Sequence, residues 1–414
     1  MHINNLPDNL LIEILKRLPC QVVLRSESVC KRWLSLISDP FFVRCFIHHH
    51  RGSIDHSLPF TLVHQFYYWH HHITETASRK IHLVSEHPIL QSRDLLLDFL
   101  PCFQHPDPWP IRIVASHGDL VVCHDNKLYS SQQSMYYVCN LLTRQWCALP
   151  PILGRHVEDD MAIGLVTYDG ENHLLPLFQY KVVRILKVGT CSNDLIVETF
   201  SSDTGEWNES LLSCPQSIQR FWQFRTSAVT LNNALHWIIN GNNGETIVVF
   251  DPFRSINDQC WLIDPPLELK FEMAHVCLGI CRDRLRVSTI KGVHPNRMLK
   301  VWELQDYGKA NWTLKYRICL KEMVFVSDCE FDMLEFSTNL VLSFHPNDED
   351  VVYLRCHNHI MKCHVRKGTL EVVSKCLGDP TFVIRTLTVF PLLHPCWPSS
   401  VYCHGKQNLR SLES

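Results

Sequence analysis

The sequence lacks the features of a secreted or membrane-spanning protein. None of its 414 residues belong to an uninterrupted apolar stretch as long as the roughly 18–20 residues of a membrane span. The first residues contain no basic run followed by an apolar core, so no signal peptide is expected. The 19 cysteines are odd in number and scattered, which favours reduced, mostly buried thiols over a disulfide framework. We therefore expect a cytosolic or nuclear protein without membrane association.

Motifs of nucleotide-binding and hydrolytic enzymes are also missing, since no GxGxxG, GxxxxGK[ST] or GxSxG occurs. The formal net charge is only −3, and the short basic stretches at 282–286 and 366–367 contain or adjoin acidic and apolar residues. Nucleic acid is therefore not an expected partner. Acidic runs at 158–160 and 348–350 lie beside turn residues, which favours solvated loops over a catalytic carboxylate pair. The sequence predicts no catalytic residues.

Histidine is abundant, with 25 residues, but its pattern does not predict a metal site. Zinc requires three or four ligands that converge tetrahedrally, and the adjacent histidines of the triplets 48–50 and 70–72 point in different directions. The densest cluster runs from Cys356 to His364 and has no accompanying CxxC pair. We therefore expect neither a metal nor a cofactor.

Two amphipathic helices are predicted at the N-terminus. The first begins at Asp8, taken as its N-cap, and ends before Pro19. Its polar residues share a single stripe, so its apolar surface exceeds what a small neighbour can cover. The second is expected from Ser26 to Ser38, where Asp39-Pro40 stops it. Because about forty residues form only a small core, the excess apolar surface predicts a docking surface for another protein.

This segment resembles the F-box, through Leu-Pro at 6–7, Ile-Leu at 14–15, Leu-Pro at 18–19, Val-Cys-Lys-Arg-Trp at 29–33 and Asp-Pro-Phe-Phe at 39–42. The resemblance implies a three-helix module that binds the Skp-type adaptor of a cullin–RING ubiquitin ligase. The adaptor contacts that it implies are Leu6, Pro7, Ile14, Leu15, Leu18, Pro19, Val29, Cys30 and Trp33. The alternative interpretation is that some of these residues, such as Ile14, only fill the module's own core.

The remainder of the chain is typical of an all-β domain, since short strand-like runs alternate with turn signals from Phe60 onward. A loose repeat places an Asp- or Asn-centred turn before a tryptophan, at 140–146, 203–207, 251–261 and 306–312. Repeats about fifty residues apart indicate a β-propeller of about six blades, closed by a strand near 381–389. A β-sandwich is the alternative architecture.

Residues 60–393 also resemble the F-box-associated, kelch-like domain of plant F-box proteins, although the regular double glycine of kelch repeats is missing. The resemblance rests on 97–101, 114–123, 140–151, 234–237, 250–252 and 277–280. We therefore predict an α+β multidomain protein with a helical F-box at 1–47, a linker at 48–59, a β-propeller at 60–395 and an unstructured tail at 396–414.

The predicted function is that of the non-catalytic substrate-recognition subunit of an SCF-type (Skp–cullin–F-box) ubiquitin ligase. The F-box docks the adaptor, and through it the cullin and RING subunits, while loops of the β domain capture an unidentified client. Two alternatives stay open. One is an adaptor-bound regulator that delivers no client to ubiquitin, and the other is a propeller enzyme with a site in its central channel.

Overall fold

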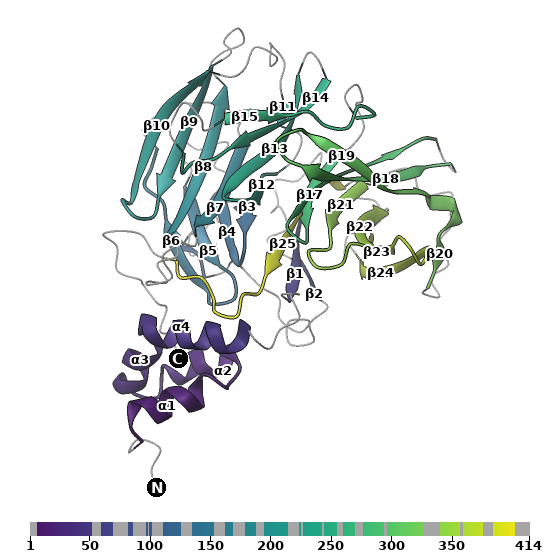
Figure 1. Ribbon diagram of the computed structural model, residues 1–414. Helices are drawn as coiled ribbons and strands as arrows, with labels where there is room; N and C mark the ends of the chain where they lie inside the picture. The colour runs from purple at the N-terminus through teal and green to yellow at the C-terminus, as the bar shows by residue number, and fades with distance from the viewer. Residues whose placement is uncertain are drawn as a thin grey trace.

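A computed structural model places a small helical module beside a large ring of β-sheets (Figure 1). The predicted α+β division of the chain is thereby confirmed. The structure describes residues 6–51, 59–68, 82–85, 97, 99–101, 111–125, 135–152, 162–168, 179–187, 194–213, 223–224, 227–241, 244–254, 260–269, 276–293, 296–326, 340–356, 359–375 and 384–401.

The helical module has four helices, where the sequence pattern predicted two and the resemblance to the F-box implied three. They are α1 (Asp8–Leu15), α2 (Cys20–Ser26), α3 (Lys31–Ile37) and α4 (Pro40–Arg51). The single helix expected from Ser26 to Ser38 is wrong, because a turn at 27–30 separates α2 from α3. Helix α4 also occupies residues 48–51, which were assigned to the linker, while residues 52–58 lie outside the described part of the chain.

Three prolines of the helical module stand at the start of helices, including Pro19 and Pro40, which we interpreted as helix ends. Pro7 and Pro19 are the N-caps of α1 and α2, so Asp8 is not the cap that the sequence suggested. Pro40 is the first residue of α4, and Asp39 Oδ1 accepts a hydrogen bond of 2.7 Å from the backbone N–H of Phe41. Proline suits these positions because the first N–H groups of a helix have no intrahelical partner.

The β domain contains six sheets, in which neighbouring strands are antiparallel except for β20, which pairs in parallel with β24. The first is β3 (Ile111–His117), β4 (Leu120–Asp125), β5 (Tyr136–Asn140) and β6 (Gln145–Ala148). The second is β7 (Ala162–Tyr168), β8 (Gln179–Lys187), β9 (Asp194–Ser201) and β10 (Glu206–Ser213). The third is β11 (Gln223–Phe224), β12 (Val229–Leu231), β13 (Ala234–Gly241), β14 (Gly244–Phe250) and β15 (Cys260–Ile263).

The fourth sheet is β16 (Val276–Cys281), β17 (Arg284–Lys291), β18 (Met298–Asp306) and β19 (Asn311–Cys319), followed by a 3₁₀ turn, η5 (Leu320–Glu322). The fifth is β20 (Val324–Phe325), β21 (Leu340–Phe344), β22 (Val351–Cys356), β23 (His359–His364) and β24 (Thr369–Lys375). The sixth joins the two ends of the domain: β1 (Phe60–Tyr68), β2 (His82–Ser85) and β25 (Ile384–Leu393).

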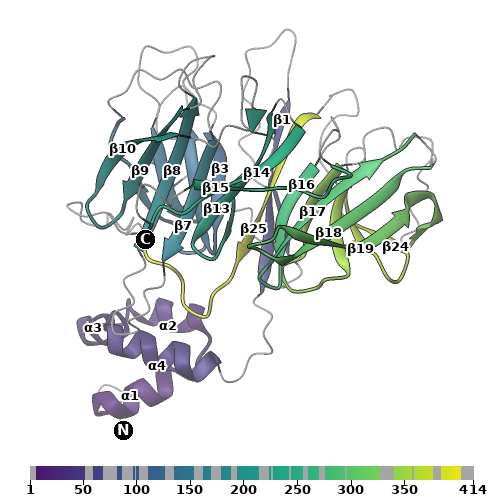
Figure 2. The same ribbon diagram turned by 45° about the horizontal axis from the view of Figure 1, so that its top comes forward.

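The sheets form a closed ring, as the tilted view shows (Figure 2). Contacts run from β25 to β3, β7, β12, β16 and β21 in turn, and β21 contacts β25 again. This is a β-propeller and not a sandwich, because successive sheets follow one another around an axis. The blade count of about six is corrected, since five blades of four or five strands are complete within the described residues. The remaining sheet, which closes the ring, has only three strands.

The predicted repeat of turn and tryptophan connects neighbouring sheets. The side chains of Asn140, Asp251 and Asp306 each accept a backbone N–H two residues further on, at 2.9–3.0 Å. The indole of Trp207 on β10 donates to Pro150 O of the preceding sheet, at 2.9 Å. The indole of Trp312 on β19 donates to Asp264 O, again of the preceding sheet, at 2.8 Å. The repeat therefore joins one blade to the next at its outer strand.

The predicted unstructured tail is wrong over residues 396–401. This segment follows β25, and Trp397, Ser399 and Val401 are all buried. In Figure 1 it is the yellow trace between the ring and the helices. Residues 402–414 lie outside the described part of the chain.

Candidate docking site on the helical module

The helical module has a complete core and, in addition, large apolar side chains on its surface. Leu11 and Leu15 of α1 are fully buried, with Trp33 of α3 beside them in the same core. Leu10 and Ile14, also on α1, are 48% and 42% exposed. Residues four apart lie on one face of a helix, so these two side chains form an outward apolar stripe. The expected excess of apolar surface on this helix is confirmed.

Arg32 of α3 brings distant parts of the module together. Its Nη2 donates to Leu6 O at 2.5 Å, and its guanidinium pairs with Asp8 Oδ1 at 2.6 Å. The start of α1 therefore lies beside the start of α3, next to the turn that carries Val29. Val29 is 56% exposed, the highest value among the large apolar side chains of the helical module. The turn and the start of α1 thus lie on neighbouring parts of the module.

The nine predicted adaptor contacts have different positions in the structure. Four are exposed, namely Pro7, Ile14, Pro19 and Val29. Three are partly buried, namely Leu6, Leu18 and Cys30. The remaining two, Leu15 and Trp33, fill the module's own core, so their expected role as surface contacts is corrected.

Four exposed apolar residues were not selected from the sequence. They are Leu10, Val22, Leu34 and Phe41. Helical periodicity identifies Leu10, because it lies four residues before Ile14 on the same face. Val22 had no such signal, because the sequence reading placed no helix between Pro19 and Ser26.

A charged edge accompanies the apolar stripe of α1. Glu13 pairs with Lys16 at 2.5 Å and with Arg17 at 3.6 Å. The hydrogen bond from Lys16 lowers the pKa of Glu13 below its usual value, so this carboxylate is ionised at neutral pH. Exposed pairs of this kind contribute little stability. They instead confine the apolar surface to the faces that hold Leu10 and Ile14.

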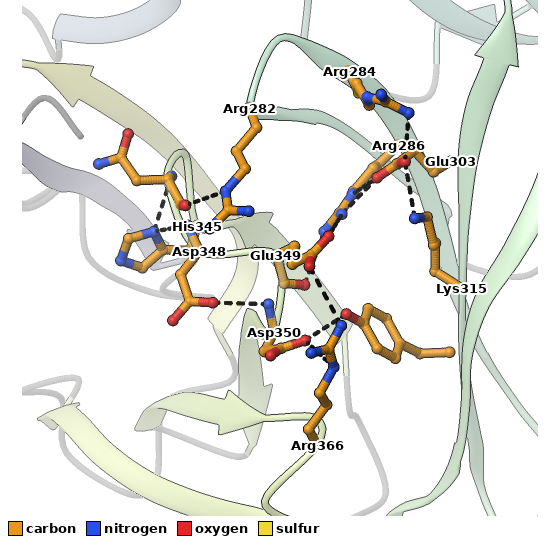
Figure 3. Close-up of polar contacts among 12 residues, drawn as sticks. Arg282, Arg284, Arg286, Glu303, Lys315, His345, Asp348, Glu349, Asp350 and Arg366 are labelled. Atoms are coloured by element: carbon orange, nitrogen blue, oxygen red, sulfur yellow. Dashed lines mark hydrogen bonds and ion pairs between the residues drawn. The ribbon is translucent and has the colours of Figure 1, made fainter. Parts of the chain in front are cut away.

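The largest group of charged side chains in Figure 3 lies between the fourth and fifth sheets. Glu303 of β18 is buried and accepts Arg286 Nη2 at 2.6 Å, with Lys315 at 3.2 Å and Arg284 at 3.3 Å. Arg286 is also buried, and its Nη1 donates to the backbone O of Glu349 in the next sheet at 2.9 Å. A buried carboxylate surrounded by cations stays ionised and connects the two blades.

The acidic run 348–350 lies in the loop between β21 and β22, as expected, but its side chains are half-buried at the same junction and are not fully solvated. Arg366 pairs with Glu349 at 3.3 Å and with Asp350 at 2.9 Å. The hydroxyl of Tyr316 on β19 donates to Asp350 Oδ1 at 2.5 Å (Figure 3). Arg366 and Tyr316 come from different sheets, and Glu349 and Asp350 each pair with Arg366. The arrangement is typical of a structural junction between blades.

No group of three or more His, Cys, Asp or Glu side chains in the described residues has the arrangement of a metal site. Residues 70–72 and the acidic run 158–160 lie outside those residues, as does His357. Twelve of the described cysteines are free thiols, whereas Cys147 is disulfide-bonded. Over the described ranges, no helix combines the length and hydrophobicity needed to span a membrane.

Family models match both parts of this architecture. Residues 92–381 match the β-propeller of the F-box protein At3g26010-like family, and residues 3–48 match the F-box-like domain. The chain belongs to this F-box β-propeller family. F-box domains generally bind Skp-type adaptors, and proteins that combine an F-box with a propeller are generally substrate receptors without catalytic activity. The F-box of this protein is the helical module that carries the exposed apolar residues.

Two relatives of this F-box protein match most of its length at low identity. Putative F-box protein At3g23970 of Arabidopsis thaliana is 25% identical, over 86% of this chain and 82% of the relative. F-box protein At3g26010 of Arabidopsis thaliana is also 25% identical, over 96% of this chain and 91% of the relative. Among solved structures, the β-propeller domain of the Trilobed protease from Pyrococcus furiosus has 9% identity and a TM-score of 0.33, over 61% of this chain and 68% of that one. That likeness is too weak to inform function.

Proposed function

We propose that this F-box protein is the substrate-recognition subunit of an SCF-type ubiquitin ligase. The observation that carries the proposal is the exposed apolar surface around Leu10, Ile14 and Val29, on a module whose core is already complete. Covering one such side chain contributes roughly 1.5–3 kcal/mol, before the cost of association. A Skp-type adaptor is the partner that an F-box surface of this kind fits, and the cullin and RING subunits join through it.

In this proposal the propeller captures the client protein, in the cytosol or the nucleus. Loops on a rigid ring of sheets vary without disturbing the scaffold, which suits a recognition surface. The chain itself performs no chemistry. It holds the client near a ubiquitin carrier and thereby raises the effective concentration of the client's lysines.

Two alternatives lead to different experimental results. An adaptor-bound regulator would co-purify with cullin, yet its deletion would leave every bound client at an unchanged half-life. A propeller enzyme would need a set of converging polar side chains whose hydrogen-bonding or charged groups are available to a substrate. The largest charged group in Figure 3 is instead internally paired, which favours the receptor.

The adaptor surface is tested by placing a charge at its centre. Ile14→Asp and Val29→Asp, each in the full chain, are expected to reduce affinity for a purified Skp-type adaptor at least a hundredfold, because a buried unpaired carboxylate opposes docking. The matched control is Leu211→Asp, which alters an equally exposed residue on β10 of the propeller. Titration calorimetry measures affinity, and circular dichroism checks folding. Unchanged adaptor affinity in both F-box variants would refute the proposed surface.

A further inference from the structure

The segment that follows the last strand connects the ring to the F-box. We name residues 394–401 the C-terminal strap. It starts where β25 ends, with Leu393 N donating to Gly118 O at 2.9 Å and His394 N donating to Pro59 O at 2.8 Å. In both views it passes between the ring and the helices (Figures 1 and 2).

Trp397 of the strap is part of the F-box core. Its ring centroid lies 5.1 Å from that of Phe46 and 5.9 Å from that of Phe42, both in edge-to-face geometry. Both phenylalanines belong to α4 and are almost fully buried, and Trp397 itself is only 8% exposed. The core that contains Leu11, Leu15 and Trp33 therefore includes an indole from near the other end of the chain.

The next residues of the strap attach to the first sheet of the propeller. Ser399 N donates to Asp119 Oδ2 at 2.8 Å, and Asn140 Nδ2 donates to Ser399 O at 3.0 Å. Asn140 Nδ2 also donates to Asp119 Oδ2 at 2.7 Å, which fixes the two propeller side chains relative to each other. Val401 is buried in the core between the first and second sheets. Within five residues, the strap thus belongs to two hydrophobic cores.

Helix α2 lies close to the same junction. Burial raises the pKa of the Cys20 thiol to about 12, and the nearby groups Cys396 and Asp119 add to this effect. The first residue of α2 is therefore close to both the strap and the β3–β4 turn. Two of the four helices face the strap, whereas Leu10, Ile14 and Val29 remain exposed in its presence. The strap is thus no inhibitory cover over the proposed adaptor surface.

We propose that the C-terminal strap is an integral part of the F-box, and that Trp397 is a positioning residue for adaptor docking. Trp397 completes the core on which α1 and α4 pack. The residues that follow it, Ser399 and Val401, attach the strap to the first propeller sheet. The part of this inference that concerns the adaptor rests on the proposed function. The structural part, that α4 depends on Trp397, stands independently of it.

The test compares Trp397→Ala with Trp312→Ala in the full chain. Trp312→Ala removes the same side chain from a partly buried position. Trp312 lies on β19, far along the ring from the strap. Hydrogen exchange with mass spectrometry is expected to show at least tenfold faster exchange of the α4 amides in Trp397→Ala, with β17 and β18 unchanged. Trp312→Ala is expected to leave α4 at the wild-type rate. Wild-type exchange of α4 in Trp397→Ala would overturn the proposal.

Adaptor affinity is measured on the same three proteins. Trp397→Ala is expected to bind the adaptor at least tenfold more weakly than the wild type, and Trp312→Ala equally well. If the wild type itself does not bind, the proposed function fails while the exchange result still decides the role of the strap. If Trp397→Ala does not fold, the variant Trp397→Phe is tested in its place. Its smaller ring keeps part of the contact with Phe42 and Phe46. Faster α4 exchange in that variant supports the proposal, and the wild-type rate overturns it.

Discussion

At the scale of single residues, burial of histidine is the feature with the clearest consequence. His236 of β13 is fully enclosed, with Nδ1 3.1 Å from Val229 O and Nε2 bonded to the Tyr307 hydroxyl. Burial lowers the pKa of His236 to about 4, and it does the same for His117 and His124. All three imidazoles are therefore neutral in the folded protein at pH values where an unfolded chain binds protons.

We expect the free energy of unfolding to fall as the pH drops from about 6.5 to about 4. The pKa of each histidine is lowered on folding, so the unfolded state binds more protons in this interval, and acid favours it by up to about 1.4 kcal/mol per pH unit and histidine. Thermal unfolding measured between pH 7.5 and 4.5 checks this expectation. His236→Gln removes one titrating group, and its stability is expected to change less over the same interval. An identical slope in wild type and variant contradicts the assignment.

At the scale of elements, the sequence predicted the β-strands better than the helix boundaries. The turn residues Asn140, Asp251 and Asp306 act locally, through hydrogen bonds to their own backbone, so a short sequence window identifies them. Pro19 and Pro40 carry an ambiguous signal, because proline both prevents a helix from continuing and suits the first turn of the next one. The sequence analysis did not consider that Pro19 starts a helix, and for this reason it did not predict α2.

The exposed apolar surface that we propose for the adaptor was predicted in kind but not residue by residue. The excess of apolar residues on α1 is a property of its sequence alone, and exposed Leu10 and Ile14 confirm it. Which apolar residues face inward depends on the other helices and on Trp397, which no local pattern relates to Phe42 or Phe46. For this reason Leu15 and Trp33 were assigned to the surface although they lie in the core.

The adjacent residues Ile14 and Leu15 separate surface from core in one experiment. Leu15→Ala is expected to destabilise the F-box by about 2–5 kcal/mol, because it leaves a cavity among fully buried side chains. Ile14→Ala changes an exposed side chain, so we expect a change within about 0.5 kcal/mol. Denaturant unfolding monitored by the exchange of α1 and α4 amides measures both. Equal destabilisation by the two variants would contradict the assignment of inward and outward faces.

At the scale of the whole molecule, the ring is closed by strands from both ends of the domain. β1 pairs with β25 from Phe60↔Leu393 to Tyr68↔Ile384, so the two ends of the propeller hold each other. The strap continues from the same strand into the F-box. The linker between α4 and β1 is therefore only one of two chain segments that join the F-box to the propeller.

Deletion at the two ends is expected to have unequal effects on the ring. A chain without residues 1–51 keeps every strand, so we expect cooperative thermal unfolding of the propeller to persist. A chain without residues 384–414 loses β25, which leaves the edge of β1 unpaired and removes the strand that β3 and β21 pack against, and an unpaired edge promotes aggregation. Near-ultraviolet circular dichroism and light scattering distinguish the two. A soluble, cooperatively unfolding chain without β25 would contradict this account of ring closure.

The position of Trp397 also places a condition on when the protein matures during synthesis. A ribosome that adds about 5–20 residues per second needs on the order of 20–70 s between Phe46 and Trp397. Throughout this interval the nascent F-box lacks the indole that belongs to its core. A message that terminates early yields a chain whose F-box lacks part of its core, however correctly the F-box itself was translated. Completion of the propeller ring and completion of the F-box core thus become a single event.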